Sequence, residues 1–108
     1  MVNVITGGAG FLGQHLARAL RTRGEPVRIV DLAPPRDVPG GTGAAIEFVQ
    51  ASITDPEALT RACDGATCIF HMAANAHLWA KDKSAYQSVN VDGTRNALAV
   101  AEQAGVKT

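Results

Sequence analysis

The chain opens with the apolar segment Val2-Asn3-Val4-Ile5 and continues with the stretch Thr6-Gly7-Gly8-Ala9-Gly10-Phe11-Leu12-Gly13. The stretch fits G-x-G-x-x-G and also G-x-x-G-x-x-G. In either register a phosphate can approach the free N–H groups at the start of a helix, where the positive end of the helix dipole lies. Gly10 would let the backbone approach the phosphate, and Gly13 would let the helix pack closely on its strand. We interpret the stretch as a cradle for a dinucleotide pyrophosphate.

A glycine motif indicates dinucleotide binding only in the right sequence context. The motif is expected between a strand and a helix, with an acidic residue about 20 residues further on. Apolar residues from Leu12 to Leu20 recur at helical spacing, and Gly24 predicts the end of that helix. The second apolar segment, Val27-Arg28-Ile29-Val30, predicts a strand that ends at Asp31. All three conditions therefore hold.

Asp31 predicts which dinucleotide is preferred. A carboxylate at the tip of the second strand can accept hydrogen bonds from the adenosine ribose hydroxyls, and it repels a 2′-phosphate. The counter-argument is Arg36, which could reach a 2′-phosphate. However, Arg36 lies beyond Pro34-Pro35 and not directly after Asp31, so we interpret it as a solvated residue. The sequence favours NAD, with NADP less favoured.

Composition limits the classes of function. With 108 residues, of which 46% are hydrophobic, the chain can bury a single core, so we expect one domain over 1–108. The formal net charge is zero and the charges are interspersed, which argues against nucleic acid or a membrane surface as a partner. No apolar run has membrane-spanning length and no leader pattern is seen, so we expect a cytoplasmic protein.

Metal and disulfide chemistry is not indicated either. Cys63 and Cys68 fit neither a zinc site nor a C-x-x-C pair and are interpreted as small buried hydrophobic residues. The residues His15, His71 and His77 lack metal-ligand spacing, so no metal is expected. We interpret His71, at a strand end, as a packed and hydrogen-bonded residue.

Strands and helices alternate along the rest of the chain. Prolines and glycines predict a loop over 32–43, and Thr54-Asp55-Pro56-Glu57 has the form of a capping box that opens a helix through Ala62. The other expected elements are strands at 46–50 and 67–72 and a long helix from Ser84 to Ala104 that Gly105 ends. This alternation predicts an α/β, Rossmann-like, doubly wound parallel sheet of about four strands in the order 3-2-1-4. Ligand is expected where the first and fourth strands diverge.

These residues resemble the extended short-chain dehydrogenase/reductases, also called the NAD-dependent epimerase/dehydratase family. Besides the glycine stretch and Asp31, the resemblance is carried by His71-Met72-Ala73-Ala74, similar to H-x-A-A, and by Asn90-Val91-Asp92-Gly93-Thr94, similar to N-V-x-G-T. It implies that Ala73 and Ala74 line the ribose and nicotinamide passage and that Asn90 is a polar organiser of the active site. The expected cofactor contacts are Gly7, Gly10, Phe11, Leu12, Gly13, Asp31, Ser52, Ile53, Ala73 and Ala74.

Two departures from the family pattern stand out. Ser52 precedes Ile53, the hydrophobic residue that flanks adenine, where the family commonly has an acid; a hydroxyl can still bond to the adenine amino group. The family takes its chemistry from a Ser or Thr after a fifth strand and from Tyr-x-x-x-Lys. The only tyrosine here is Tyr86, with Asn90 four residues on, and the chain stops at Thr108, where a fifth strand would begin. We therefore interpret Tyr86 as a helix-packing residue and the chain as a truncated, cofactor-binding portion that is inactive by itself.

The resemblance implies an enzyme that acts by hydride transfer on a nucleotide sugar, sterol-like or related secondary alcohol. A dinucleotide-sensing module of the same fold, without chemistry, is the alternative, because fold alone cannot separate the two. A domain that binds S-adenosylmethionine shares the glycine turn but gives no reason for the two later motifs. A homodimer of the complete protein is left open as a further partner.

Overall fold

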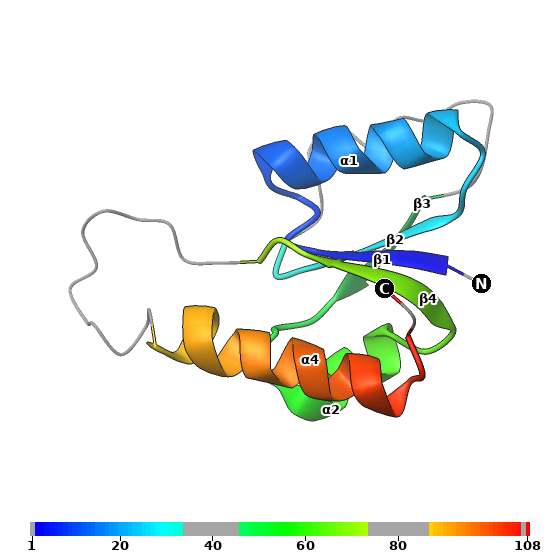
Figure 1. Ribbon diagram of the computed structural model, residues 1–108. Coiled ribbons are helices and arrows are strands. Elements are labelled where there is room, and N and C mark those ends of the chain that lie inside the picture. The colour runs from blue at the N-terminus through cyan, green and yellow to red at the C-terminus, as the bar shows by residue number, and fades with distance from the viewer. Residues whose placement is uncertain (1, 34–45, 74–86, 107) are drawn as a thin grey trace.

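The computed structural model describes residues 2–33, 46–73, 87–106 and 108. Figure 1 shows the arrangement of the elements. The strands are β1 (Val2–Thr6), β2 (Val27–Asp31), β3 (Ile46–Gln50) and β4 (Ala66–His71). The helices are α1 (Phe11–Thr22), α2 (Pro56–Ala62) and α4 (Gly93–Gln103), and α4 is preceded by the π-helical turn η1 (Gln87–Asp92). The interpretations of Arg36, His77 and Tyr86 and the expected contact of Ala74 lie outside the described residues.

The four strands form one parallel sheet in the order β3-β2-β1-β4. This confirms the fold class and the strand order predicted from the alternation of strands and helices. Helix α1 covers one face of the sheet, and α2 and α4 cover the other (Figure 1). The carboxyl ends of β1 and β4 lie side by side, since Thr6 pairs with His71 in the register of the two strands. The predicted ligand edge therefore collects the segments that follow each strand.

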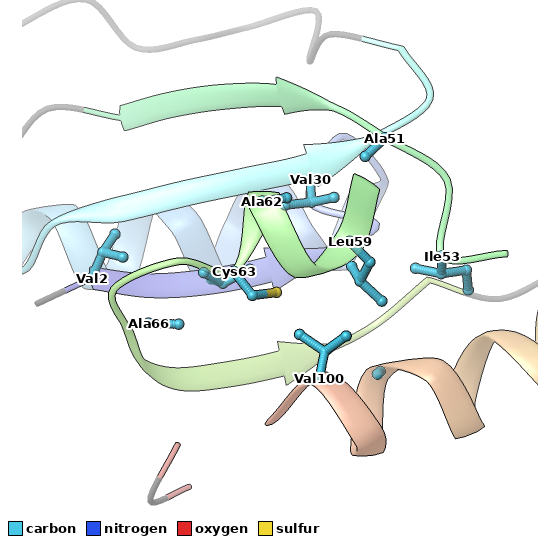
Figure 2. Close-up of a cluster of buried hydrophobic side chains, with 11 residues drawn as sticks. Val2, Val30, Ala51, Ile53, Leu59, Ala62, Cys63, Ala66 and Val100 are labelled. Carbon is cyan, nitrogen blue, oxygen red and sulfur yellow. The ribbon is translucent and has the colours of Figure 1, made fainter. Parts of the chain in front are cut away.

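Two buried clusters hold these layers together. One lies between the sheet and α1 and includes Ile5, Ala17 and Ile29. The other lies between the sheet and the pair α2 and α4, and Figure 2 shows it extending from Val2 at one end to Ile53 at the other. Both clusters contain strand residues because a doubly wound sheet is buried on its two faces. This explains why β1 and β2 read as almost continuous apolar runs.

The long helix predicted over 84–104 differs from the observed one. Its described part consists of the π-helical turn η1 followed by the regular helix α4, which begins at Gly93. A π-type turn shifts the helical register locally, and such turns are frequent at functional sites. Apolar periodicity gave no signal for it.

The start of α2 also differs from the predicted capping box. The N-cap is Asp55, whose Oδ1 accepts a hydrogen bond of 3.2 Å from the N–H of Ala58. Pro56 takes the first helical position, as expected, so the residue directly before it becomes the cap. The hydroxyl of Thr54 instead contacts the Ser52 hydroxyl at 2.6 Å. The predicted role of Thr54 as the cap was therefore wrong.

The end of the chain lies along the outer edge of β4. The N–H of Ile69 donates to the carbonyl of Thr108 at 2.9 Å. Val106 packs against the buried cluster under α4. These contacts place the residues after α4 beside the fourth strand.

Arg28 ties the sheet to the end of α2. Its Nη1 donates hydrogen bonds of 2.7 Å to the carbonyls of Ala62 and Asp64, and its Nε lies 3.5 Å from Glu47 Oε2. The last carbonyls of a helix lack partners within the helix. Arg28 supplies donors to this end of α2, although sequence analysis treated it only as a strand residue.

We expect Arg28→Met to lower the free energy of unfolding by about 1–3 kcal/mol, the range for losing hydrogen bonds made by a charged group. Methionine keeps the apolar stem and removes the donors. Urea denaturation followed by circular dichroism measures the change. Arg95→Met is the matched control, because the Arg95 side chain is 75% exposed and lies 3.8 Å from Asp92. Equal effects of the two substitutions would contradict the role assigned to Arg28.

Candidate functional site

A cavity of about 250 Å³ lies at the carboxyl ends of the strands. Its walls come from the glycine loop after β1, the end of β2 and the segments that follow β3 and β4. Of the residues singled out from the sequence, it is lined by Gly7, Gly10, Asp31, Ser52, Ile53 and Ala73. Four further residues line the cavity that were not among the expected cofactor contacts: Val30, Leu32, Ala51 and Met72. The fold thus brings together residues that are far apart in sequence, at the edge predicted for ligand.

Two glycines of the loop are required by the packing of the protein itself. Gly7 has φ +69°, and a Cβ there would lie 2.8 Å from the backbone N and Cα of Ala73. A Cβ on Gly13 would lie 2.6 Å from the Gly7 carbonyl oxygen and from the Cα of Gly8. The close approach of Gly13 is therefore to the loop after β1, and not to the strand itself as predicted.

Gly10 differs from these two glycines. Its backbone is extended, with φ −75° and ψ 175°, a conformation open to any residue. A Cβ there would meet the Gly7 carbonyl oxygen at 3.3 Å and, apart from its chain neighbours, no other heavy atom of the described residues within 4 Å. That contact is tight but can be relieved by a small shift. Neither backbone strain nor dense packing explains a glycine at this position.

The start of α1 is open. No side chain caps the N-terminus, and the first turn contains no acidic residue. Helix geometry leaves the first N–H groups, including those of Phe11 and Leu12, without acceptors in the helix. The side chains of Phe11 and Leu12 are 78% and 64% exposed and do not line the cavity. Any contact of these two residues with a ligand in the cavity would come from their backbone.

Asp31 and Gln14 hold the loop on either side of Ala9. The N–H of Ala9 donates to Asp31 Oδ2 at 3.0 Å, and Gln14 Nε2 donates to the Ala9 carbonyl at 2.7 Å. Asp31 Oδ1 accepts a further bond of 2.7 Å from the N–H of Leu32. Each carboxylate oxygen keeps acceptor capacity, because it has a second lone pair. Asp31 therefore positions the loop and can still accept hydroxyl donors, whereas sequence analysis assigned it only the second task.

The Ser52 hydroxyl is part of a local turn. Ser52 Oγ accepts a 3.1 Å bond from the N–H of Thr54 and lies 2.6 Å from the Thr54 hydroxyl. It can accept from an adenine amino group only when its own proton points to Thr54, since a hydroxyl has two acceptor sites. The orientation of the Ser52 and Thr54 hydroxyl protons thus determines whether Ser52 can accept a hydrogen bond from a base.

A chain of hydrogen bonds connects the end of β4 with η1. The Thr94 hydroxyl donates to the Asn90 carbonyl at 2.8 Å and lies 3.0 Å from His71 Nε2. Because a threonine hydroxyl has one proton, we assign the proton of the neutral imidazole to Nε2. His71 Nδ1 then accepts from the Thr6 hydroxyl at 2.7 Å.

The fully buried Thr6 hydroxyl also accepts from the backbone at the cavity. The N–H groups of Met72 and Ala73 donate to its oxygen at 3.1 and 3.3 Å. The chain of bonds therefore runs from the Ala73 backbone to Asn90. Asn90 itself lies in η1 and does not line the cavity.

Protonation of His71 would disturb this chain of bonds. A proton on Nδ1 would turn the ring from acceptor to donor toward Thr6, whose oxygen already accepts from two N–H groups. Burial lowers the pKa of His71 below its usual value, which favours the same neutral form. The interpretation of His71 as packed and hydrogen-bonded agrees with these contacts.

We expect the stability that His71 confers to be pH-dependent. Above the unfolded pKa of about 6.5 the imidazole is neutral in both states. As the pH falls below that value, the unfolded chain takes up a proton before the folded chain does, so the wild-type free energy of unfolding decreases. His71→Gln removes this titration, and the stability difference between wild type and variant should shrink from pH 8 to pH 5. Urea denaturation at several pH values measures it, and a constant difference would contradict the assignment.

The described part of the chain supports neither a metal centre nor a membrane span. No group of three or more His, Cys, Asp or Glu side chains among those residues could hold a metal ion. No described helix is both long and apolar enough to cross a bilayer.

The chain is similar in sequence and in fold to known proteins. The chain is 39% identical over 110 residues to a 3 beta-hydroxysteroid dehydrogenase/Delta 5→4-isomerase of Mycobacterium tuberculosis, covering 96% of this chain and 29% of that protein. A short-chain dehydrogenase/reductase superfamily protein of Agrobacterium tumefaciens with bound NAD is 38% identical, with a TM-score of 0.82, covering 98% of this chain and 30% of that one. Thermus thermophilus UDP-glucose 4-epimerase in complex with NAD is 33% identical with a TM-score of 0.82, over 98% and 35% of the two chains.

The chain thus spans about a third of the length of these relatives. The sequence model of the 3-beta hydroxysteroid dehydrogenase/isomerase family matches residues 4–108. The glycine loop, the strand order and this match agree, and the chain belongs to the 3-beta hydroxysteroid dehydrogenase/isomerase family of extended short-chain dehydrogenase/reductases.

Proposed function

We propose that residues 1–108 form the NAD-binding domain of an oxidoreductase or epimerase that acts by hydride transfer. The observation that carries this proposal is Gly10. It lies at the open start of α1 and lines the cavity, and neither its backbone conformation nor dense packing demands a glycine there. A pyrophosphate that must approach the N–H groups of the first helical turn supplies the reason. Solved relatives with bound NAD support the choice of cofactor.

Each part of NAD is assigned to residues of this proposed site. The pyrophosphate would lie at Gly7, Gly10 and the backbone of Phe11, Leu12 and Gly13. Asp31 would accept the hydroxyls of the adenosine ribose, and Ser52 and Ile53 would flank adenine. Ala73, whose N–H is held by Thr6, would line the passage toward the nicotinamide, with Ala74 following it. When bound, NAD accepts or returns a hydride at its nicotinamide ring.

The substrate in the complete protein is proposed to be a nucleotide sugar, sterol-like or related secondary alcohol. Support comes from the names of the relatives, which include a hydroxysteroid dehydrogenase and a UDP-glucose epimerase. Asn90 would organise the active site from η1. A cytoplasmic location and a homodimer of the complete protein remain part of this proposal.

We further propose that this chain alone binds the cofactor without turnover. Its 108 residues contain no Tyr-x-x-x-Lys, because Asn90 stands four residues after Tyr86. The same observation favours the second candidate, a dinucleotide-sensing module without chemistry. A Ser or Thr followed by Tyr-x-x-x-Lys in sequence beyond Thr108 would decide for the enzyme, and its absence there would decide for the sensor.

Calorimetric titration of the folded, monodisperse chain with NAD tests the binding proposal. We expect Gly10→Val to weaken NAD binding at least a hundredfold, about 2.7 kcal/mol, because the added methyl groups occupy the space of the pyrophosphate. Ala19→Val, which introduces the same side chain at an exposed position of α1, should leave affinity unchanged. Unaltered NAD affinity in a folded Gly10→Val chain would contradict the cradle.

Asp31→Asn should narrow the preference for NAD over NADP. A carboxylate and a phosphate about 4 Å apart repel by roughly 1–4 kcal/mol, depending on exposure, and a neutral amide removes this repulsion. Because Asp31 also accepts from Ala9 and Leu32, the variant should in addition bind NAD more weakly than the wild type. Titrations with both dinucleotides measure the two effects. A variant as selective as the wild type would remove Asp31 from its assigned role.

A further inference from the structure

Two residues of α4, Gly93 and Asn96, both contact Ile53. The Cα of Gly93 lies so close to Ile53 that a Cβ there would come within 2.4 Å of its Cδ1 and 2.7 Å of its Cγ1. One helical turn further on, Asn96 Nδ2 donates a hydrogen bond of 2.8 Å to the Ile53 carbonyl. One contact is steric and the other polar, and they reach the side chain and the backbone of the same residue.

Ile53 lies in a turn between β3 and α2, outside any regular element (Figure 2). It lines the cavity and is only 7% exposed. On its buried side it belongs to the cluster that includes Leu59, Ala97 and Val100. If a Cβ were added at position 93, the Ile53 side chain would have to move. It would meet dense packing on its buried side and open space on the side of the cavity.

We propose that Gly93 and Asn96 are positioning residues that set the adenine wall of the cofactor cavity through Ile53. The inference rests on the proposed function, because it takes the cavity to hold NAD and Ile53 to flank adenine. Gly93 gives the Ile53 side chain the room to withdraw from the cavity. Asn96 holds the Ile53 carbonyl by a hydrogen bond and so fixes the position of the turn relative to α4. The width of the adenine site is then decided by a helix that does not itself line the cavity.

The same helix follows directly on η1, which contains Asn90. The motif Asn90-Val91-Asp92-Gly93-Thr94 therefore does more than supply an organiser at one end of the site. Thr94 bonds to His71 and to the Asn90 carbonyl, while Gly93 packs on Ile53. Neighbouring residues of one motif thus contact Ile53 directly and the Ala73 backbone through His71 and Thr6.

The test is calorimetric binding of NAD and of ADP-ribose, which keeps the adenosine and the pyrophosphate but lacks nicotinamide. Gly93→Ala should weaken both ligands by the same factor, about tenfold, since the added Cβ drives Ile53 into the adenine site. Asn96→Ala should weaken both to a lesser extent. Leu98→Ala is the matched control on α4, because its side chain is exposed and lies away from this cavity.

A double variant isolates the mechanism. Ile53→Ala removes Cγ1, Cγ2 and Cδ1 and leaves the Cβ, which is 3.4 Å from the Cβ position on Gly93, an ordinary contact. In an Ile53→Ala background, Gly93→Ala should therefore cost little further affinity, so the two substitutions are not additive. Thermal unfolding of each variant confirms that the comparison is between folded chains.

Three results would overturn the inference. They are unchanged affinity in a folded Gly93→Ala chain, an equal loss from Gly93→Ala with and without Ile53→Ala, and a loss for NAD that spares ADP-ribose. If Gly93→Ala fails to fold, Asn96→Ala decides, and wild-type affinity for both ligands in that variant would refute the role of α4. A folded wild type that binds neither ligand would instead overturn the proposed function, and the inference with it.

Discussion

Close approach of backbone to backbone at the carboxyl ends of β1 and β4 is the constraint on which the rest of this structure depends. Gly7 turns the chain out of β1 with a positive φ and brings its Cα against the backbone of Ala73. Gly13 then lets the first turn of α1 lie on the loop that precedes it. A side chain at either glycine would separate these segments, and the cavity between them would lose its shape.

The loop built this way is held by hydrogen bonds within the protein. Asp31 and Gln14 bind the N–H and the carbonyl of Ala9, and the Gly10 N–H donates to the Gly7 carbonyl at 3.1 Å. A binding loop that is already ordered loses less conformational freedom when its ligand arrives. The carboxylate expected to select the cofactor therefore also holds the glycine loop, which links the proposed selectivity to loop geometry.

Helix α4 connects the two ends of the site. Thr94 joins it to His71, Thr6 and the backbone at Ala73, and Gly93 and Asn96 join it to Ile53. The junction of η1 with α4 stands between these contacts, where a π-type turn changes the direction in which side chains point. A family motif that reads as a marker of the active site is thus also the support of the cavity walls.

The parallel sheet, its strand order, the glycine loop and the gathering of Gly10, Asp31 and Ile53 at one edge could all be predicted from the amino-acid sequence. These follow from local patterns and from the handedness of strand crossovers, which leave few topologies open. Which glycines serve packing and which one does not emerged from the packed fold, because contacts such as those of Gly13 and Gly93 join segments whose spacing the sequence does not encode. The second role of Asp31 and the tautomer of His71 likewise depend on hydrogen bonds between distant residues, and such bonds form only when the layers are packed.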